Sequence, residues 1–182
     1  WFDSDDVMFS DFLTVKMSKL SGGKDILICN GNFVYSDLNF RNKFNFKKKT
    51  YLFKDFLLYN IHIFTPSILF RKSFLSSKNL FMNNLSRGQE LEMFSRFFYD
   101  LEYKDVEIID QSLFLYRFHN DSMNEKDKLY NKKYKKSLSF VYLENLKRSI
   151  ILQDKELINF FYLKLIGFLF RGIENKHHSN SK

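Results

Sequence analysis

The sequence Trp1-Phe2-Asp3-Ser4-Asp5-Asp6 determines how the rest of this chain is interpreted. Two aromatic residues run directly into three carboxylates, a pattern typical of a strand that ends in a turn at one edge of a sheet. Carboxylates this close repel one another, so they must be solvated, protonated or neutralised by a cation. Mg²⁺ and Mn²⁺ prefer oxygen ligands and often bind carboxylates together with phosphate oxygens. The stretch therefore predicts either a divalent-cation site or an acidic turn that caps the next helix.

Two later stretches, Ser86–Arg96 and Leu115–Ser122, strengthen the first interpretation. Together with Asp3–Asp6 they resemble, in order, the DxD segment, the G-E-D-x-E-L helix start and the Y-R-x-H-x-x-S segment of family 2 glycosyltransferases. The resemblance runs from Trp1 to about Met123 and implies an α/β chain, a partial GT-A domain followed by a helical C-terminal extension. In that family a nucleotide-binding half precedes the DxD segment. We therefore expect the sequence to be a fragment that neither binds a nucleotide tightly nor transfers sugar by itself.

The resemblance also implies a metal site. Asp3 and Asp5 would bind a divalent cation, Mg²⁺ or Mn²⁺, with Asp6 in support, and His119 would return to the same metal. Judged by its residue type alone, a histidine that follows a strand is usually structural. We therefore expect Asp3, Asp5 and His119 to converge in the fold.

Donor and acceptor roles follow from the same resemblance. Asp3, Arg117 and Ser122 would contact the donor phosphates, since the planar guanidinium of arginine donates two parallel hydrogen bonds. Glu90 would be the general base, at the start of a helix whose dipole keeps a carboxylate ionised. Without the resemblance, Glu90 is an ordinary first-turn acid, and Glu92 is the second candidate for the base.

These expectations predict an inverting glycosyltransferase that moves a sugar from a nucleotide-diphosphate sugar to the hydroxyl of a glycan or lipid-linked acceptor. Its setting would be the synthesis of surface polysaccharides or other glycans, with no nucleic-acid partner. The alternative is a non-catalytic basic adaptor that binds nucleic acid or an anionic membrane through Lys126–Lys182.

Composition bounds both interpretations. The chain has 182 residues, 45% of them apolar, with 23 phenylalanines, which suits one domain with an appendage. Residues 1–125 carry 16 basic and 16 acidic side chains, whereas residues 126–182 carry 13 and 5, so the whole net charge of +8 lies in the last third. We therefore divide the chain at residue 125 and expect an anionic neighbour, either a membrane or nucleic acid, for the basic part.

Cysteine usage and hydropathy add little about location. The single Cys29 lies among apolar residues and predicts a buried structural thiol. The sequence contains no signal peptide and no apolar stretch long enough to cross a bilayer. These observations favour a cytoplasmic protein, with peripheral attachment to the inner face of the cell membrane as an option.

The pattern of apolar residues predicts alternating helices and strands. Helices are expected at Ser10–Leu20, with Phe12, Leu13, Met17 and Leu20 as the apolar positions, at Tyr51–Tyr59, from Arg87 onward, and once or twice after Lys126. Strands are expected at Asp25–Cys29, Phe33–Tyr35, Ser67–Phe70, Val106–Ile109 and Leu113–Phe118. Asn30–Asn32 predicts either a hairpin or a kink in one strand, and Arg41–Thr50 predicts an exposed connection. Leu157–Phe170 is apolar almost all round, so it packs on the domain, pairs with another subunit or lies in a membrane interface.

Overall fold

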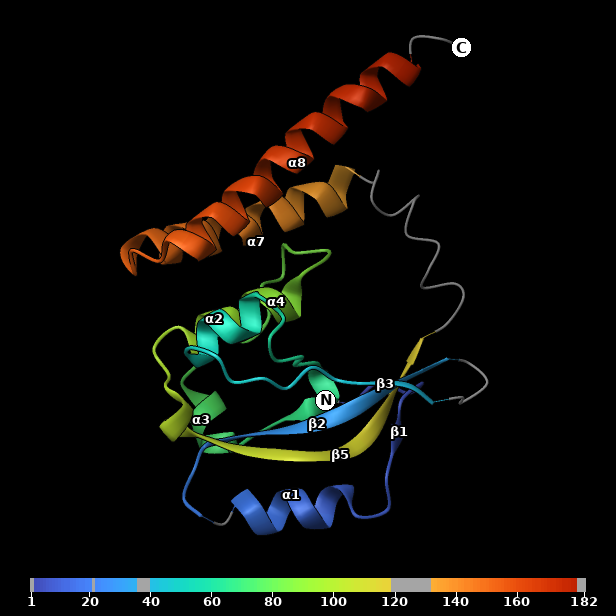
Figure 1. Cartoon of the computed structure of the whole chain (residues 1–182), viewed down its shortest axis with the longest axis vertical. Helices are drawn as coiled ribbons and strands as arrows, with labels where there is room; N and C mark the ends of the chain where they lie inside the picture. Colours follow the sequence, from blue (N-terminus) through green and yellow to red (C-terminus); the bar gives the residue numbers. More distant parts are fainter. Residues whose placement is uncertain (1, 21, 36–39, 119–131, 180–182) are drawn as a thin grey trace. The chain divides into compact units, whose positions relative to one another are not determined.

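The computed structural model describes residues 2–20, 22–35, 40–118 and 132–179, which form a mixed α/β protein (Figure 1). The chain divides into two compact units: unit 1 comprises Trp1–Phe81 and Met93–Glu125, and unit 2 comprises Met82–Glu92 and Lys126–Lys182. One division therefore falls at residue 125, where the charge distribution changes. The Met82–Glu92 segment, however, belongs with the C-terminal helices.

Unit 1 is built on a mixed sheet with the strand order β1-β5-β2-β3. Strand β2 (Ile26–Tyr35) pairs in parallel with β5 (Val106–Phe118). Along its other edge β2 pairs antiparallel with β3 (Phe40–Lys43) and β4 (Ile68–Phe70). The short strand β1 (Val7–Met8) pairs antiparallel with β5. A central strand with neighbours on both edges suits the apolar sequence that begins β2, which is wholly buried.

Both long strands contain polar residues at which the sequence pattern suggested an interruption. Asn30–Asn32 lies inside the continuous strand β2, which excludes the hairpin, and the prediction of two strands separated at Asp110–Ser112 was wrong. The β2–β5 ladder shifts register around these residues, so irregular pairing absorbs the interruptions. Gly31 serves packing here, because a Cβ at this position would lie 2.5 Å from Cζ of Phe114.

Helices cover both faces of this sheet. Helix α1 (Phe12–Leu20) packs on one face, and α2 (Leu52–Leu57) and the Met93–Phe98 part of α4 (Gln89–Phe98) lie over the other (Figure 1). The remaining short elements are the 3₁₀ turns η1 (Thr65–Ser67) and η2 (Tyr103–Asp105) and the unpredicted helix α3 (Lys72–Ser76).

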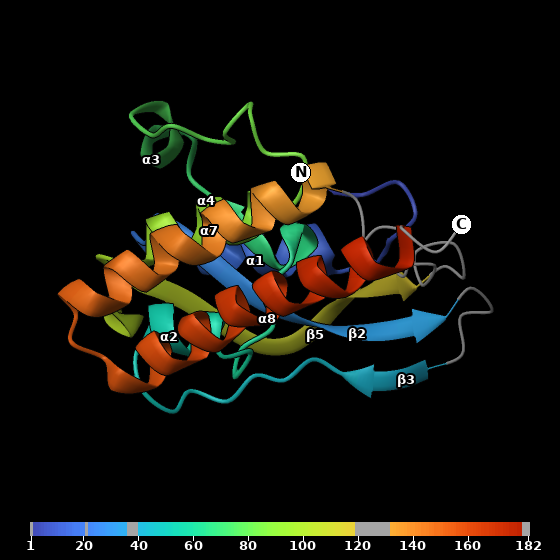
Figure 2. The ribbon, with the colours of Figure 1, turned by 90° about the horizontal axis from the view of Figure 1, so that it is seen from above.

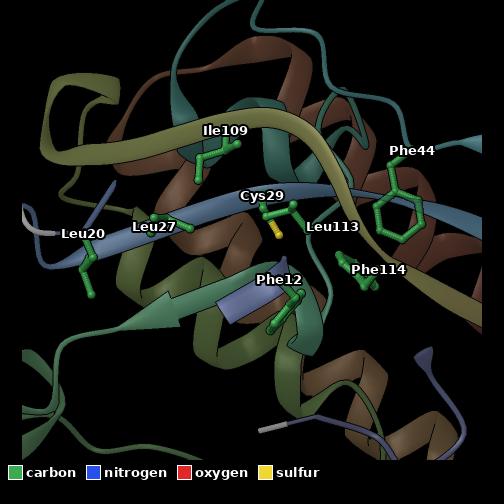
Figure 3. Close-up of a cluster of buried hydrophobic side chains, with 8 residues drawn as sticks. All are labelled: Phe12, Leu20, Leu27, Cys29, Phe44, Ile109, Leu113 and Phe114. Atoms are coloured by element: carbon green, nitrogen blue, oxygen red, sulfur yellow. The ribbon is translucent and has the colours of Figure 1, made fainter. Parts of the chain in front are cut away.

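The apolar cluster between α1 and the sheet shows which face of that helix is buried (Figure 3). Phe12 and Leu20 point into it, but Leu13 and Met17 are 60% and 59% exposed, so the predicted apolar face was only half right. Lys16, 1% exposed, takes the central buried position.

Lys16 is tolerated in the core because its ammonium group has partners. Its Nζ donates a 2.7 Å hydrogen bond to the carbonyl of Pro66 and lies 4.0 Å from the ring centroid of Phe12. Burial lowers the pKa of Lys16 and raises that of its neighbour Cys29, which is a buried free thiol as predicted.

The connection predicted to be exposed at residues 41–50 is more ordered than expected. It begins within β3, Phe44 is buried, and Phe46 pairs with Ile61. The end of this segment is held by the buried carboxylate of Asp55, which accepts hydrogen bonds from the backbone N–H groups of Lys49 and Thr50, the Thr50 hydroxyl, the Asn60 amide and the Tyr103 hydroxyl.

Unit 2 contains two long helices, α7 (Lys132–Ile151) and α8 (Lys155–Ser179), which pack side by side (Figures 1 and 2). The turn between them has Gln153 at φ 55°, and Asp154 accepts the N–H groups of Glu156 and Leu157 at the start of α8. The predicted helical extension is thus confirmed as two helices. In the parts of the chain that the structure describes, no helix is long and apolar enough to cross a membrane.

Candidate functional site

The acidic stretch forms a turn that comes before strand β1. The preceding aromatic residue Phe2 is not part of a strand, so the predicted order of strand and turn was wrong. The turn closes with a backbone hydrogen bond from the N–H of Asp6 to the carbonyl of Asp3 at 3.2 Å. Because Val7 pairs with Leu115, the turn lies beside the end of β5.

This register brings the first and third motifs of the sequence together. The backbone N–H of Arg117 in β5 donates a 2.9 Å hydrogen bond to Oδ1 of Asp6, across 111 positions of the chain. The structure thus joins the acidic turn to the arginine that the resemblance assigns to phosphate. The carboxylate that makes this connection is Asp6, which was expected only to support the metal ligands Asp3 and Asp5.

The environment of Asp6 disfavours its charged form. Burial is the largest effect and raises the pKa of Asp6 to about 6, although the hydrogen bond from Arg117 opposes it. The negative charges of Asp5 and Asp3 raise this pKa further. A positive charge bound next to Asp6 would offset both the cost of burying its charged carboxylate and the repulsion from Asp5 and Asp3.

Two buried polar atoms beside the contact between Asp6 and Arg117 make no hydrogen bond within the described residues. One is Oδ2 of Asp6, an acceptor, and the other is Nε of Arg117, a donor. Buried polar atoms are rarely left unpaired, so each is available to water or to a bound ligand. A divalent cation fits the carboxylate oxygen, and a phosphate oxygen fits the guanidinium N–H. The residues present therefore suit a cation bound together with a phosphate.

The predicted metal ligands are only partly described. Asp3 is exposed and Asp5 is half-buried in the same turn, whereas His119 and the predicted phosphate contact Ser122 lie outside the described residues. Among the residues that the structure does describe, no group of three or more His, Cys, Asp or Glu side chains is arranged to hold a metal ion. The convergence of Asp3, Asp5 and His119 stays a prediction.

Glu90 and Glu92 have different surroundings in unit 2. Glu90 is exposed in the first turn of α4, where a carboxylate is favoured by the helix dipole. Glu92 is 2% exposed, and its Oε1 lies 3.9 Å from Nη2 of Arg148 in α7. An accessible carboxylate suits proton transfer, whereas a buried and paired one suits a structural role.

Helix α7 holds the segment that carries Glu90. The hydroxyl of Ser137 accepts the backbone N–H of Ser86 at 3.0 Å, and the two serine hydroxyls are also 3.0 Å apart. Gly88 has φ +74° and lies against Leu138, so a larger residue would be strained there. With Glu92 paired to α7 on its other side, the Glu90 turn is fixed at both ends.

Sequence reasoning did not anticipate these supports. Nothing in the pattern of α7 marks Ser137 or Arg148 as partners of a segment about fifty residues earlier, because helical periodicity identifies a face but not what it contacts. For Asp6 a signal existed, since it lies next to the start of a strand, but locating its partner required the register of β1 and β5.

No family model matches this chain, and a search of curated proteins found no significant match.

Proposed function

We propose that this chain supplies the cation-, diphosphate- and acceptor-binding groups of an inverting glycosyltransferase that uses a nucleotide-diphosphate sugar. The observation that supports the proposal is the hydrogen bond between Asp6 and the backbone of Arg117, with one unpaired acceptor and one unpaired donor beside it. These two motifs come from opposite ends of unit 1, and their meeting is what a metal-diphosphate site would require. The GT-A architecture is part of the proposal.

The roles of the residues follow from their chemistry. Asp6, with Asp3 and Asp5 from the same turn, would hold the cation, and Arg117 would donate its free N–H to a phosphate oxygen. The bound cation would stabilise the negative charge of the departing diphosphate as a Lewis acid. Ser122 and His119 keep their proposed contacts to phosphate and metal.

Glu90 is the proposed general base. Its carboxylate would take the proton of the acceptor hydroxyl while the hydroxyl oxygen forms a bond to the anomeric carbon and the bond from that carbon to the diphosphate breaks. Attack opposite the leaving group inverts the configuration at this carbon. The exposed position of Glu90 on a turn fixed by α7 supports this role over that of Glu92, whose carboxylate is buried.

Calorimetry with Mn²⁺, in the presence and absence of pyrophosphate, tests the proposal on the full chain. We expect Mn²⁺ to bind, pyrophosphate to tighten this binding, and Asp6→Asn to weaken it at least tenfold. Asp100→Asn, which removes an exposed carboxylate elsewhere in unit 1, is the matched control. Equal Mn²⁺ affinity in the two variants would contradict the proposal.

In a protein that combines this chain with a nucleotide-binding half, a screen of nucleotide-diphosphate sugars, read out as released nucleoside diphosphate, would then identify the donor. The acceptor, a glycan or a lipid-linked sugar, would be sought with that donor.

A further inference from the structure

Helix α8 has two apolar faces, only one of which is covered by α7. Leu157 and Phe161 are buried, and Tyr142 of α7 stacks on Phe168 with a centroid distance of 5.6 Å. The other face carries large apolar side chains that remain accessible: Tyr162, Leu163 and Phe170, which are 54%, 66% and 64% exposed. We refer to these three residues as the apolar stripe.

Helix geometry places the stripe away from α7. At about 100° per residue, Tyr162, Leu163 and Phe170 fall within an arc of about 100°, roughly opposite Leu157 and Phe161. The end of α7 and the turn before α8 carry three more accessible apolar side chains, Ile150, Ile151 and Leu152. Several large apolar side chains exposed along one helix face are a feature of interaction surfaces.

The charge around the stripe indicates what kind of partner fits. The exposed lysines among the side chains that the structure describes in the two helices are Lys133, Lys136, Lys147, Lys155 and Lys164. Among the described side chains of α7 and α8, the exposed carboxylate is that of Glu156. Residues 126–182 as a whole carry 13 basic and 5 acidic side chains. The two helices are therefore predominantly cationic, and helix geometry places Lys155 on the same side of α8 as the apolar stripe.

We propose that α8 lies flat on an anionic phospholipid surface, with the apolar stripe in the boundary between headgroups and acyl chains and the lysines against lipid phosphates. Apolar area and basic charge act together in such binding. A second copy of the chain would instead bring two cationic surfaces together. Nucleic acid would use the lysines but gain little from Leu163 or Ile151, because aliphatic side chains do not stack on bases as aromatic ones do. This proposal is independent of any transfer activity.

Co-sedimentation of the full chain with lipid vesicles tests this proposal. The vesicles contain equal amounts of phosphatidylglycerol and phosphatidylcholine, or phosphatidylcholine alone. We expect binding to the anionic vesicles that weakens as salt is added, and little binding to the neutral ones. The double variant Leu163→Gln with Phe170→Gln should bind the anionic vesicles at least about tenfold more weakly, since two apolar side chains no longer insert.

The matched control is Leu13→Gln with Met17→Gln on α1, which removes two side chains of similar exposure from unit 1. Circular dichroism verifies that both variants keep their helices. Equal vesicle binding by the wild type and the α8 variant would overturn the proposal, as would no binding by the wild type. A dimer that the α8 variant abolishes, without vesicle binding, would assign the stripe to a second copy. Tight binding of single-stranded RNA without vesicle binding would assign the lysines to nucleic acid.

Discussion

The hydrogen bond between Asp6 and Arg117 uses the backbone N–H of the arginine and leaves its side chain out of the connection. The acidic turn can therefore stay attached to β5 with any residue except proline at position 117, because only the backbone N–H is needed. The guanidinium group of Arg117 can therefore be removed while the hydrogen bond between the turn and β5 remains. Binding by this side chain can be tested without disrupting the fold of the site.

Arg117→Met should keep the fold and lose anion binding. The variant removes a buried Nε–H that makes no hydrogen bond within the described residues, so stability should stay equal or rise slightly. Affinity for pyrophosphate in the presence of Mn²⁺ should fall about 10- to 100-fold, the usual worth of a charged hydrogen bond. Calorimetry measures this, and Lys104→Met, an exposed cation of unit 1, is the control. Unchanged affinity would remove Arg117 from the site.

Asp6 should make the stability of the protein depend on pH. Its pKa is about 6 in the fold and near 4 in the unfolded chain, so its favourable contribution is complete below pH 4 and is lost as the pH rises through 6. The loss should be on the order of 1 kcal/mol, because the carboxyl is only partly buried. Asp6→Asn keeps the Oδ1 acceptor for Arg117 and should flatten this part of the profile.

Denaturant unfolding between pH 4 and 8 measures the effect. Mn²⁺ should restore stability at pH 8 in the wild type but not in Asp6→Asn. If the two proteins show the same profile with and without the metal, the carboxyl of Asp6 is not the titrating group and not a ligand.

Asp55 should be essential to the stability of unit 1. Burial disfavours its charge, but the hydrogen bonds from Tyr103, Thr50, Lys49 and Asn60 outweigh this effect and lower the pKa of Asp55. Asp55→Ala should reduce the free energy of unfolding by at least about 3 kcal/mol, since it leaves several buried donors unpaired. Tyr103→Phe, which removes one 2.6 Å hydrogen bond, should reduce it by about 1–2 kcal/mol.

Thermal and urea unfolding of these variants measures the difference. Because the pKa of Asp55 is lowered in the fold, its contribution is present above pH 4 and disappears as the pH falls further. If Asp55→Ala reduces the free energy of unfolding no more than Tyr103→Phe does, the Lys49–Thr50 segment is held by other contacts.

Glu90 and Glu92 form a natural pair of test and control. In a protein that combines this chain with a nucleotide-binding half, Glu90→Gln should leave stability and donor binding nearly unchanged and reduce transfer about 10²- to 10⁴-fold, the usual share of a general base. Glu92→Gln should instead lower stability, because it breaks the buried pair with Arg148. Single-turnover transfer and urea unfolding on both variants separate the two effects. Loss of transfer in Glu92→Gln alone, with its fold intact, would move the base role to that residue.

The sequence predicted the elements of this fold better than their faces and boundaries. Apolar periodicity located α1, α2, α4 and the C-terminal helices, since helix length and spacing are local properties. It placed Leu13 and Met17 on the buried face of α1, where Lys16 lies instead. The local sequence does not reveal that the carbonyl of Pro66 is available to a buried lysine. It also divided β5 at Asp110–Ser112 and left open whether Asn30–Asn32 interrupts β2, whereas a parallel ladder with shifted register accommodates both polar stretches.

The candidate site was predictable only in part for the same reason. The residue types of the acidic turn and of Arg117 were visible in the sequence, but their meeting depends on which residue of β1 pairs with which residue of β5. The network around Asp55 had no sequence signal at all. Its partners come from three separate segments, and each residue taken alone is an ordinary polar loop residue.

The contact between Gly31 and Phe114 gives a criterion for recognising relatives of this chain. Because a Cβ at position 31 would lie within 3 Å of three atoms of the ring, the two positions are coupled. A distant homologue that keeps the β2–β5 ladder should pair glycine with a large residue, or exchange both together. Such correlated substitution can persist after overall identity has fallen too low for alignment, so this pair offers a structural marker for tracing the ancestry of the fold.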